Sequence, residues 1–222
     1  MPATGPRRFC CDADLATIGY DGLHADHDLK AFRSGRIAPT TRELIDVLVD
    51  EGIEGATVLD VGAGVGAVHL TLLERGAGAA VDVDASREYL AAAAAEAERR
   101  GLAGRVEHRY GDVVELAAEL PPVDVVTLDQ VICCYPYLDA LVGAVVRPLP
   151  RLIGLTYPHD AWWMRIALRA FNLAAAIRRR PDKYFVHRQA RLDRLMADAG
   201  YRLVHEGGIP IWRVLVYRRE NA

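Results

Sequence analysis

The stretch Val58-Leu59-Asp60-Val61-Gly62-Ala63-Gly64-Val65-Gly66 decides the fold of this chain. Its apolar half predicts a buried strand, and the strand runs into a turn of three alternating glycines. Glycines let the backbone turn tightly and let a ligand lie against bare amide groups. Asp60 precedes the first glycine by two residues and can accept hydrogen bonds from a cationic amino group. The stretch therefore predicts a site for a nucleoside that carries a positively charged amino-acid portion, as S-adenosylmethionine does.

Length and charge limit the classes of protein to consider. A chain of 222 residues fits one α/β domain, and its net charge of −3 gives no field that would recruit nucleic acid. No apolar run approaches the ~20 residues that span a bilayer. The first eight residues lack the apolar core of a signal peptide. We therefore expect a cytoplasmic monomer or homodimer whose partner is a small molecule, with no nucleic acid and no membrane.

The four cysteines form two adjacent pairs, Cys10-Cys11 and Cys133-Cys134. Neighbouring cysteines rarely bridge each other, and no Cys-x-x-Cys motif is present, so we expect no disulfide framework and no metal site. Buried thiols at a sheet edge are the simpler interpretation of Cys133 and Cys134. The alternative is soft-ligand binding, as in arsenic methylation, and it requires the two pairs to meet in space.

Patterns of strand and helix alternate from residue 57 onward, which predicts a parallel sheet with helices on both faces. The expected strands are 57–61, 79–83, 106–110, 123–128 and 151–156. The expected helices between them are 67–75, 86–100, 113–120 and 138–146. A long helical stretch over 161–180, a helix over 188–199 and an antiparallel hairpin of 202–206 and 211–217 complete the chain, with Gly207-Gly208 as the hairpin turn. The whole forms a sheet of seven strands, one of them antiparallel.

Local signals set several helix ends. Thr40 and Glu43 have the spacing of a capping box for a helix that runs to about Glu51, and Ser86 caps the alanine-rich helix after the second strand. Short helices are expected at 12–18 and 27–32. The run Arg178-Arg179-Arg180 is interpreted as a solvated helix end.

Polar groups follow the carboxyl ends of four strands, where ligands of open α/β sheets bind. We assign the glycine turn to contact with the ligand and Asp84 to the ribose hydroxyls. The side chain of Asp82 points to the same side of the strand, but Asp84 has the roughly 20-residue spacing from the turn that this role requires. Asp112 is assigned to the adenine amino group, and Asp129 or Gln130 to the methionine portion. The predicted cofactor residues are Asp60, Gly62, Ala63, Gly64, Gly66, Asp84, Ala85, Gly111, Asp112, Val113, Asp129 and Gln130.

A nicotinamide-dependent oxidoreductase is the first alternative, because Gly62 to Ala67 also satisfies the dinucleotide pattern G-x-G-x-x-A. Asp60 argues against it, since a buried acid beside a pyrophosphate would repel it. The antiparallel hairpin at the end of the chain also differs from the dinucleotide pattern. A non-catalytic protein that binds the cofactor but lacks room for an acceptor is a second alternative.

These motifs resemble those of the class I S-adenosylmethionine-dependent methyltransferases. The resemblance covers about residues 40–155 and the terminal hairpin. The segments Val131 to Pro136 and Tyr157 to Trp163 resemble an uncharacterised bacterial subgroup of small methyltransferases, and the layout is distantly similar to magnesium-protoporphyrin O-methyltransferases. The resemblance implies a Rossmann-like α/β fold with a helical N-terminal lid, and S-adenosylmethionine as cofactor. It divides one domain, 1–222, into a lid (1–38), a cofactor-binding core (39–156), a helical cover (157–187) and the last helix with the hairpin (188–222).

The expected reaction is methyl transfer to an oxygen atom of a small organic acceptor, with transfer to nitrogen as the second choice. Methyl transfer is mainly a positioning task, and a general base helps when the nucleophile is a hydroxyl. His159 lies beside Asp160 after the fifth strand and could be a base that the carboxylate orients. Tyr135 follows the fourth strand, where substrate is expected. His187 precedes the last helix and is the third catalytic candidate, with capping as its simpler role.

Overall fold

The computed structural model describes residues 22–177 and 184–220. The strands are β1 (Thr57–Val61), β2 (Ala79–Asp84), β3 (Val106–Tyr110), β4 (Val125–Asp129), β5 (Leu152–Pro158), β6 (Tyr201–Ile209) and β7 (Trp212–Arg219). The helices are α2 (Gly22–Arg33), α3 (Pro39–Asp50), α4 (Ala67–Glu74), α5 (Arg87–Arg99), α6 (Val113–Leu116), α7 (Leu138–Val146), α8 (Trp162–Ile177) and α9 (Gln189–Asp198). Two short 3₁₀ turns, η1 (Ala103–Arg105) and η2 (Ile132–Cys134), complete the description.

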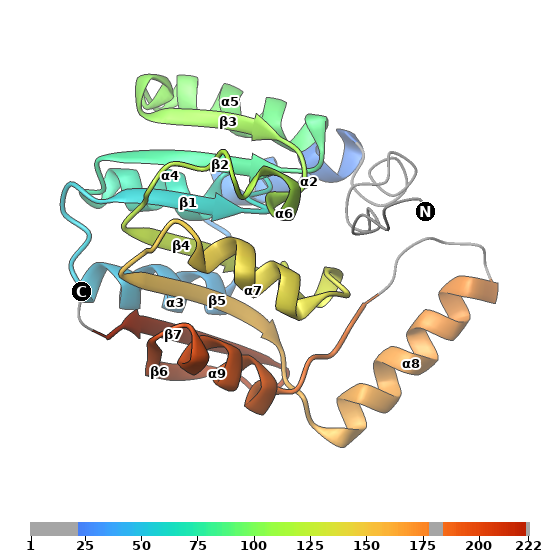
Figure 1. Ribbon diagram of the computed structural model, residues 1–222. Helices are drawn as coiled ribbons and strands as arrows, with labels where there is room; N and C mark the ends of the chain where they lie inside the picture. Colours follow the sequence, from blue (N-terminus) through green and yellow to red (C-terminus); the bar gives the residue numbers. More distant parts are fainter. Residues whose placement is uncertain (1–21, 178–183, 221–222) are drawn as a thin grey trace, which may run out of the picture.

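The strands form one sheet in the order β3-β2-β1-β4-β5-β7-β6 (Figure 1). Strands β1 to β5 are parallel to one another, and β7 is antiparallel to both β5 and β6. The order reverses between β1 and β4, which puts the carboxyl end of β1 at the switch point where ligands of such sheets bind. The predicted α/β fold, with six strands in one direction and one against them, is confirmed.

Two apolar layers cover the sheet. Because side chains alternate across a strand, Val58 packs into the layer of α2, α3, α4 and α5, whereas its neighbour Leu59 packs into the layer of α6, α7 and α9. Within α5, Ser86 caps the first turn by accepting a hydrogen bond from the backbone N–H of Tyr89 at 3.2 Å. This cap was predicted from the sequence and is confirmed.

Two local predictions are wrong. Pro39 occupies the first turn of α3 and Ala38 is the capping residue, so Thr40 lies inside the helix and no capping box forms with Glu43. Proline suits the first helical position because its missing N–H would have no helical partner there. In the hairpin, Gly207 and Gly208 lie within β6, and the chain turns after Ile209.

The predicted N-terminal lid lies partly outside the described residues, which include its helix α2 but not the helix expected at 12–18. Likewise, Arg178-Arg179-Arg180 lies outside them. Helix α2 packs on α5: Phe32 is buried, and the guanidinium of Arg100 lies 4.2 Å from the centre of its ring. The hydroxyl of Tyr89 donates to Asp28 at 2.6 Å.

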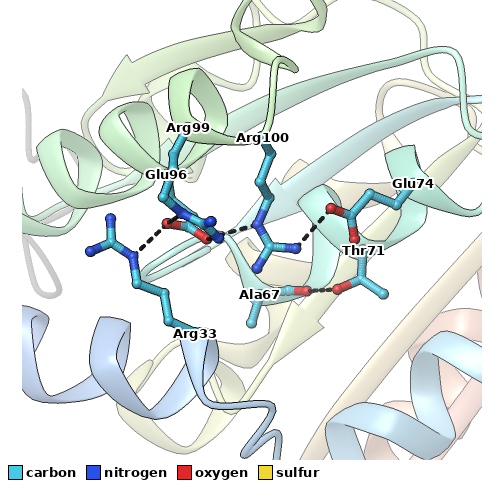
Figure 2. A network of polar contacts seen from close by, with 7 residues as sticks. All are labelled: Arg33, Ala67, Thr71, Glu74, Glu96, Arg99 and Arg100. Carbon is cyan, nitrogen blue, oxygen red and sulfur yellow. Dashed lines mark hydrogen bonds and ion pairs between the residues drawn. The ribbon is translucent and has the colours of Figure 1, made fainter.

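A buried carboxylate joins α2 to α5 (Figure 2). Glu96 has no exposed surface, and its oxygens accept hydrogen bonds from Arg99 at 2.6 Å, Arg100 at 2.7 Å and Arg33 at 2.8 Å. The hydrogen bond from Arg99, with those from the other two arginines, lowers the pKa of Glu96 to about 2, against the opposing effect of burial. Arg33 comes from α2, so this cluster ties the N-terminal helix to the core.

We expect Glu96→Gln to lower the free energy of unfolding by about 2 kcal/mol at neutral pH. A carboxyl with a lowered folded-state pKa stabilises the fold above its unfolded value of 4.5, and this advantage is lost as the pH falls towards about 2. Urea unfolding at several pH values measures the difference. Glu98→Gln changes an exposed acid of the same helix and is the control. Equal losses from both variants would contradict the role of Glu96.

Candidate functional site

The carboxyl ends of β1, β2 and β3 are joined by hydrogen bonds. The N–H of Gly62 donates to the carbonyl of Val83 at 2.7 Å, and the N–H of Gly111 donates to the carbonyl of Asp84 at 3.0 Å. The side chain of Asp84 accepts from the N–H of Gly64 at 2.9 Å and from the N–H of Ser86 at 2.8 Å. Asp84 therefore lies where the three loops meet.

The glycine turn needs its glycines. Gly62, Gly64 and Gly66 have φ values of 62°, 57° and 82°, which side chains rarely adopt. A Cβ on Gly62 would lie 2.5 Å from Cγ2 of Val131, and one on Gly66 would lie 2.9 Å from Cε1 of His69. The turn thus requires glycine for both its backbone angles and its neighbours, and it leaves Ala63 and Gly64 partly exposed.

Asp84 and Asp82 now have distinct surroundings. Burial, as the largest cause, raises the pKa of Asp84 to about 6, against the hydrogen bonds from Ser86 and Gly64. A carboxylate has about four acceptor sites, so two remain for a ligand. Asp82 has no exposed surface, and its Oδ2 lies 2.7 Å from Nδ1 of His108 on β3. The geometry therefore favours Asp84 as the acid that faces a ligand.

Asp60 is held by the protein itself. Its side chain is 1% exposed, its Oδ1 accepts from the hydroxyl of Thr127 at 2.6 Å, and its Oδ2 lies 2.9 Å from Nδ1 of His69. The N–H of His69 also donates to Oδ2, at 3.3 Å. The direct contact with a ligand's amino group that the sequence suggested therefore stays a prediction, and the observed contacts join Asp60 to β4 and α4.

Asp129 ends β4 on the other side of β1. Its Oδ2 accepts from the hydroxyl of Thr41 at 2.6 Å, and its Oδ1 accepts from the hydroxyl of Thr156 at 2.5 Å. Burial raises the pKa of Asp129, and these two hydrogen bonds oppose the rise. Nothing in the sequence singled out Thr41 and Thr156, because their partner lies on a different element.

Gln130 follows Asp129 with a φ of 61°, which is rare for a residue with a side chain and is often found at functional sites. Its N–H donates to the hydroxyl of Thr156 at 2.9 Å, and its carbonyl accepts from the thiol of Cys133 at 3.2 Å. The side chain of Gln130 is exposed. The backbone after β4 is therefore held in a strained form beside Asp129.

The structure brings Asp112 and Tyr135 together, which the sequence did not predict. Asp112 caps α6 by accepting from the N–H of Val114 at 2.8 Å, and the hydroxyl of Tyr135 donates to its Oδ2 at 2.9 Å. Both side chains are buried. Tyr135 thus links the loop after β4 to the loop after β3, and its hydroxyl is engaged rather than free for an acceptor.

The two histidines predicted as bases, His159 and His187, also contact other groups of the protein. Nε2 of His159 lies 2.8 Å from Nη2 of Arg213, a group that only donates, while Nδ1 of His159 lies 3.9 Å from Asp160, too far for the predicted orienting hydrogen bond. Nε2 of His187 donates to the carbonyl of Tyr135 at 2.8 Å, and burial lowers the pKa of His187. Both residues position loops at this end of the sheet, and their catalytic roles stay predictions.

The sulfur atoms of Cys133 and Cys134 lie 3.7 Å apart, and both thiols donate to the carbonyl of Gln130, at 3.2 and 3.9 Å. Cys10 and Cys11 lie outside the described residues, so the meeting of the two pairs stays a prediction.

Within residues 22–177 and 184–220, no group of three or more His, Cys, Asp or Glu side chains is placed to hold a metal ion. None of the helices in those ranges has the length and apolar content needed to cross a bilayer.

A family model described as a methyltransferase domain matches residues 58–150, from β1 to the turn before β5. The chain contains a methyltransferase domain. Its sheet order and terminal hairpin are those of the class I S-adenosylmethionine-dependent methyltransferases, which confirms the family resemblance seen in the sequence. The dinucleotide-dependent alternative has no support from this match.

Two curated relatives align with part of this chain. The ribosomal protein L11 methyltransferase of Stenotrophomonas maltophilia is 37% identical over 161 residues, which are 70% of this chain and 44% of the relative. The release factor glutamine methyltransferase of Cereibacter sphaeroides is 36% identical over 115 residues, which are 51% of this chain and 38% of the relative. The chain thus spans less than half the length of each relative.

A solved structure agrees with the fold over nearly the whole chain. Magnesium protoporphyrin IX methyltransferase from Synechocystis PCC 6803, solved with bound S-adenosylmethionine, superposes with a TM-score of 0.67 at 17% identity. The match covers 98% of this chain and 100% of that one. At this identity the likeness shows the fold of this chain and nothing of what it acts on.

Proposed function

We propose that this chain is an S-adenosylmethionine-dependent methyltransferase that methylates an oxygen atom of a small organic acceptor. One observation carries the proposal: the glycine turn of β1 lies between two partly buried carboxylates, Asp84 on β2 and Asp129 on β4, at the switch point of the sheet. Asp84 supplies acceptors for the ribose hydroxyls. Asp129 lies on the side of β4 and β5, where the acceptor is expected.

The residues present fit the cofactor. The glycine turn leaves exposed backbone beside Asp84, and Asp112 and Val113 follow β3 where an adenine ring would lie. When bound, S-adenosylmethionine supplies a methyl group on a positively charged sulfur. The protein's own part is to hold the acceptor in line with that group and to take up its proton.

Asp129 is the residue we assign to proton removal. A hydroxyl nucleophile loses a proton when it is methylated, and a base works best when its pKa is raised towards the working pH. Burial raises the pKa of Asp129, and Thr41 and Thr156 fix the direction of its oxygens. Tyr137, which is half exposed just before α7, adds an aromatic side chain to the segment that follows β4.

Calorimetric titration of S-adenosylmethionine into the full chain tests the cofactor site. We expect Asp84→Ala to weaken binding by about tenfold to a hundredfold, because a charged acceptor for the ribose hydroxyls is lost. Binding should also weaken as the pH falls below about 6, where Asp84 takes up a proton.

Asp124→Ala is a matched control for that variant. Asp124 also accepts a backbone N–H, that of Thr57 at 2.8 Å, but it lies at the opposite edge of the sheet. Its loss should leave the affinity unchanged. Tight binding of NAD in place of S-adenosylmethionine, or equal affinities of Asp84→Ala and the unchanged chain, would contradict the proposal.

Methylation of nitrogen on a protein is the second candidate, because the names of both curated relatives point to protein substrates. A transfer assay with labelled cofactor separates the two. Small phenols, alcohols and carboxylic acids are offered in one arm, and amines and ribosomal protein in the other, with mass spectrometry to locate the methyl group.

A further inference from the structure

Helix α8 presents a row of apolar side chains to solvent. Four of them are exposed by more than half: Trp162 by 72%, Ile166 by 56%, Leu173 by 64% and Ile177 by 75%. Their spacings of four, seven and four residues keep them on one side of a helix. Trp163, exposed by 42%, borders the row. We call these five residues the α8 stripe, which at 3.6 residues per turn spans about 100° of the helix.

Other side chains of α8 hold the helix in place. The ring of Phe171 packs edge-to-face on Tyr184, with 5.4 Å between the ring centres. The side chain of Asn172 bonds the backbone of Tyr184 twice, at 2.7 and 3.0 Å, and Ala175 is buried. Within the described residues, the α8 stripe is therefore not the face that attaches the helix to its neighbours.

The charged residues of α8 are all basic. Between Trp162 and Ile177 the helix carries Arg165 and Arg169 and no acidic residue. On a helical projection, these two arginines lie one turn apart along the edge of the α8 stripe that Trp162 begins. An apolar face with tryptophan, bordered by basic residues, is typical of a helix that lies in the plane of a membrane surface.

We propose that the α8 stripe docks on the surface of a bilayer that contains anionic lipids. Arginines beside an inserted apolar face gain from negative headgroups. A second copy of this chain would meet the stripe with another helix of the same charge, which disfavours self-association. The expectation of no membrane came from the lack of a spanning segment, and a helix that lies in the interface needs none.

The docking would also place the candidate site near lipid. Helix α8 follows the carboxyl end of β5, the edge of the sheet that carries Asp84 and Asp129, and in Figure 1 it extends away from the sheet. A chain seated through α8 therefore turns this edge towards the bilayer. This inference does not depend on the reaction, and its test does not measure methyl transfer.

Co-sedimentation of the full chain with vesicles tests the docking. We expect binding to vesicles of phosphatidylcholine mixed with phosphatidylserine, weaker binding to phosphatidylcholine alone, and release at high salt. Arg165→Gln and Arg169→Gln should each weaken binding about fivefold. Leu173→Glu should weaken it at least about tenfold, because it removes a large apolar group from the docked face.

Leu149→Glu is the matched control, because Leu149 is a leucine with nearly the same exposure, 63% against 64%, that precedes β5 at the other edge of the sheet. It should bind vesicles like the unchanged chain, and retained S-adenosylmethionine affinity reports that each variant is folded. Failure to bind either kind of vesicle would overturn the proposal. So would equal binding by Leu173→Glu and Leu149→Glu, or a dimer in solution that Leu173→Glu dissociates.

Discussion

Asp129→Asn should lower kcat by about two to four orders of magnitude while the affinity for S-adenosylmethionine changes little. Proton transfer by a positioned base contributes a factor of this size, and asparagine keeps the shape of the side chain but cannot take up the proton. Thr41 and Thr156 donate to different oxygens of Asp129. In the variant, one of these two hydroxyls would therefore meet the NH2 group of asparagine in place of an acceptor oxygen. Single-turnover kinetics with saturating cofactor measure the loss.

The pH dependence of the rate distinguishes a general base at Asp129 from a residue that only binds the cofactor. The rate should rise with pH as Asp129 loses its proton. The hydrogen bond from Thr41 lowers the pKa of Asp129, so Thr41→Val should move this rise to higher pH and leave the plateau close to that of the unchanged chain. If Asp129 instead holds the methionine portion, as the sequence suggested, Asp129→Asn would weaken cofactor binding at nearly constant kcat.

The sequence was sufficient for features set by neighbours along the chain. The carboxyl ends of β1 to β4 were located from apolar runs and the residues that follow them, and the choice of Asp84 over Asp82 rested on the spacing from the glycine turn. Register then explains the difference between the two acids: Asp82 lies opposite Asp60 and His108 in the middle of the sheet, whereas Asp84 lies at its edge.

Features set by distant partners could not be predicted in this way. The hydroxyl of Tyr135 donates to Asp112, 23 residues earlier, and Thr41 reaches Asp129 across 88 residues. Each side chain looked available in the sequence because its partner lies on another element. The same limit applies to the hairpin, where two glycines resembled a turn but the pairing with β7 continues through both.

Asp60 and Asp82 should respond in opposite ways to the same substitution. They are buried partners on β1 and β2, yet Asp60 has three donors, from Thr127 and His69, whereas Oδ1 of Asp82 is buried without a partner in the described part of the chain. Asp60→Asn places an amide N–H opposite one of these donors and breaks the buried pair of Asp60 with His69. It should therefore lower the free energy of unfolding by about 3 kcal/mol.

Asp82→Asn should instead stabilise the fold by about 1 kcal/mol at neutral pH. Burial is the largest cause that raises the pKa of Asp82, so its ionised form opposes folding. A carboxyl whose pKa is raised in the folded state lowers the free energy of unfolding as the pH rises above its unfolded-state pKa. The gain from asparagine should therefore vanish below about pH 4. Urea unfolding of both variants at pH 7 and in acid measures this. A loss of stability from Asp82→Asn at pH 7 would show that its charge is balanced by His108 and His69, which lie on the same face of the sheet.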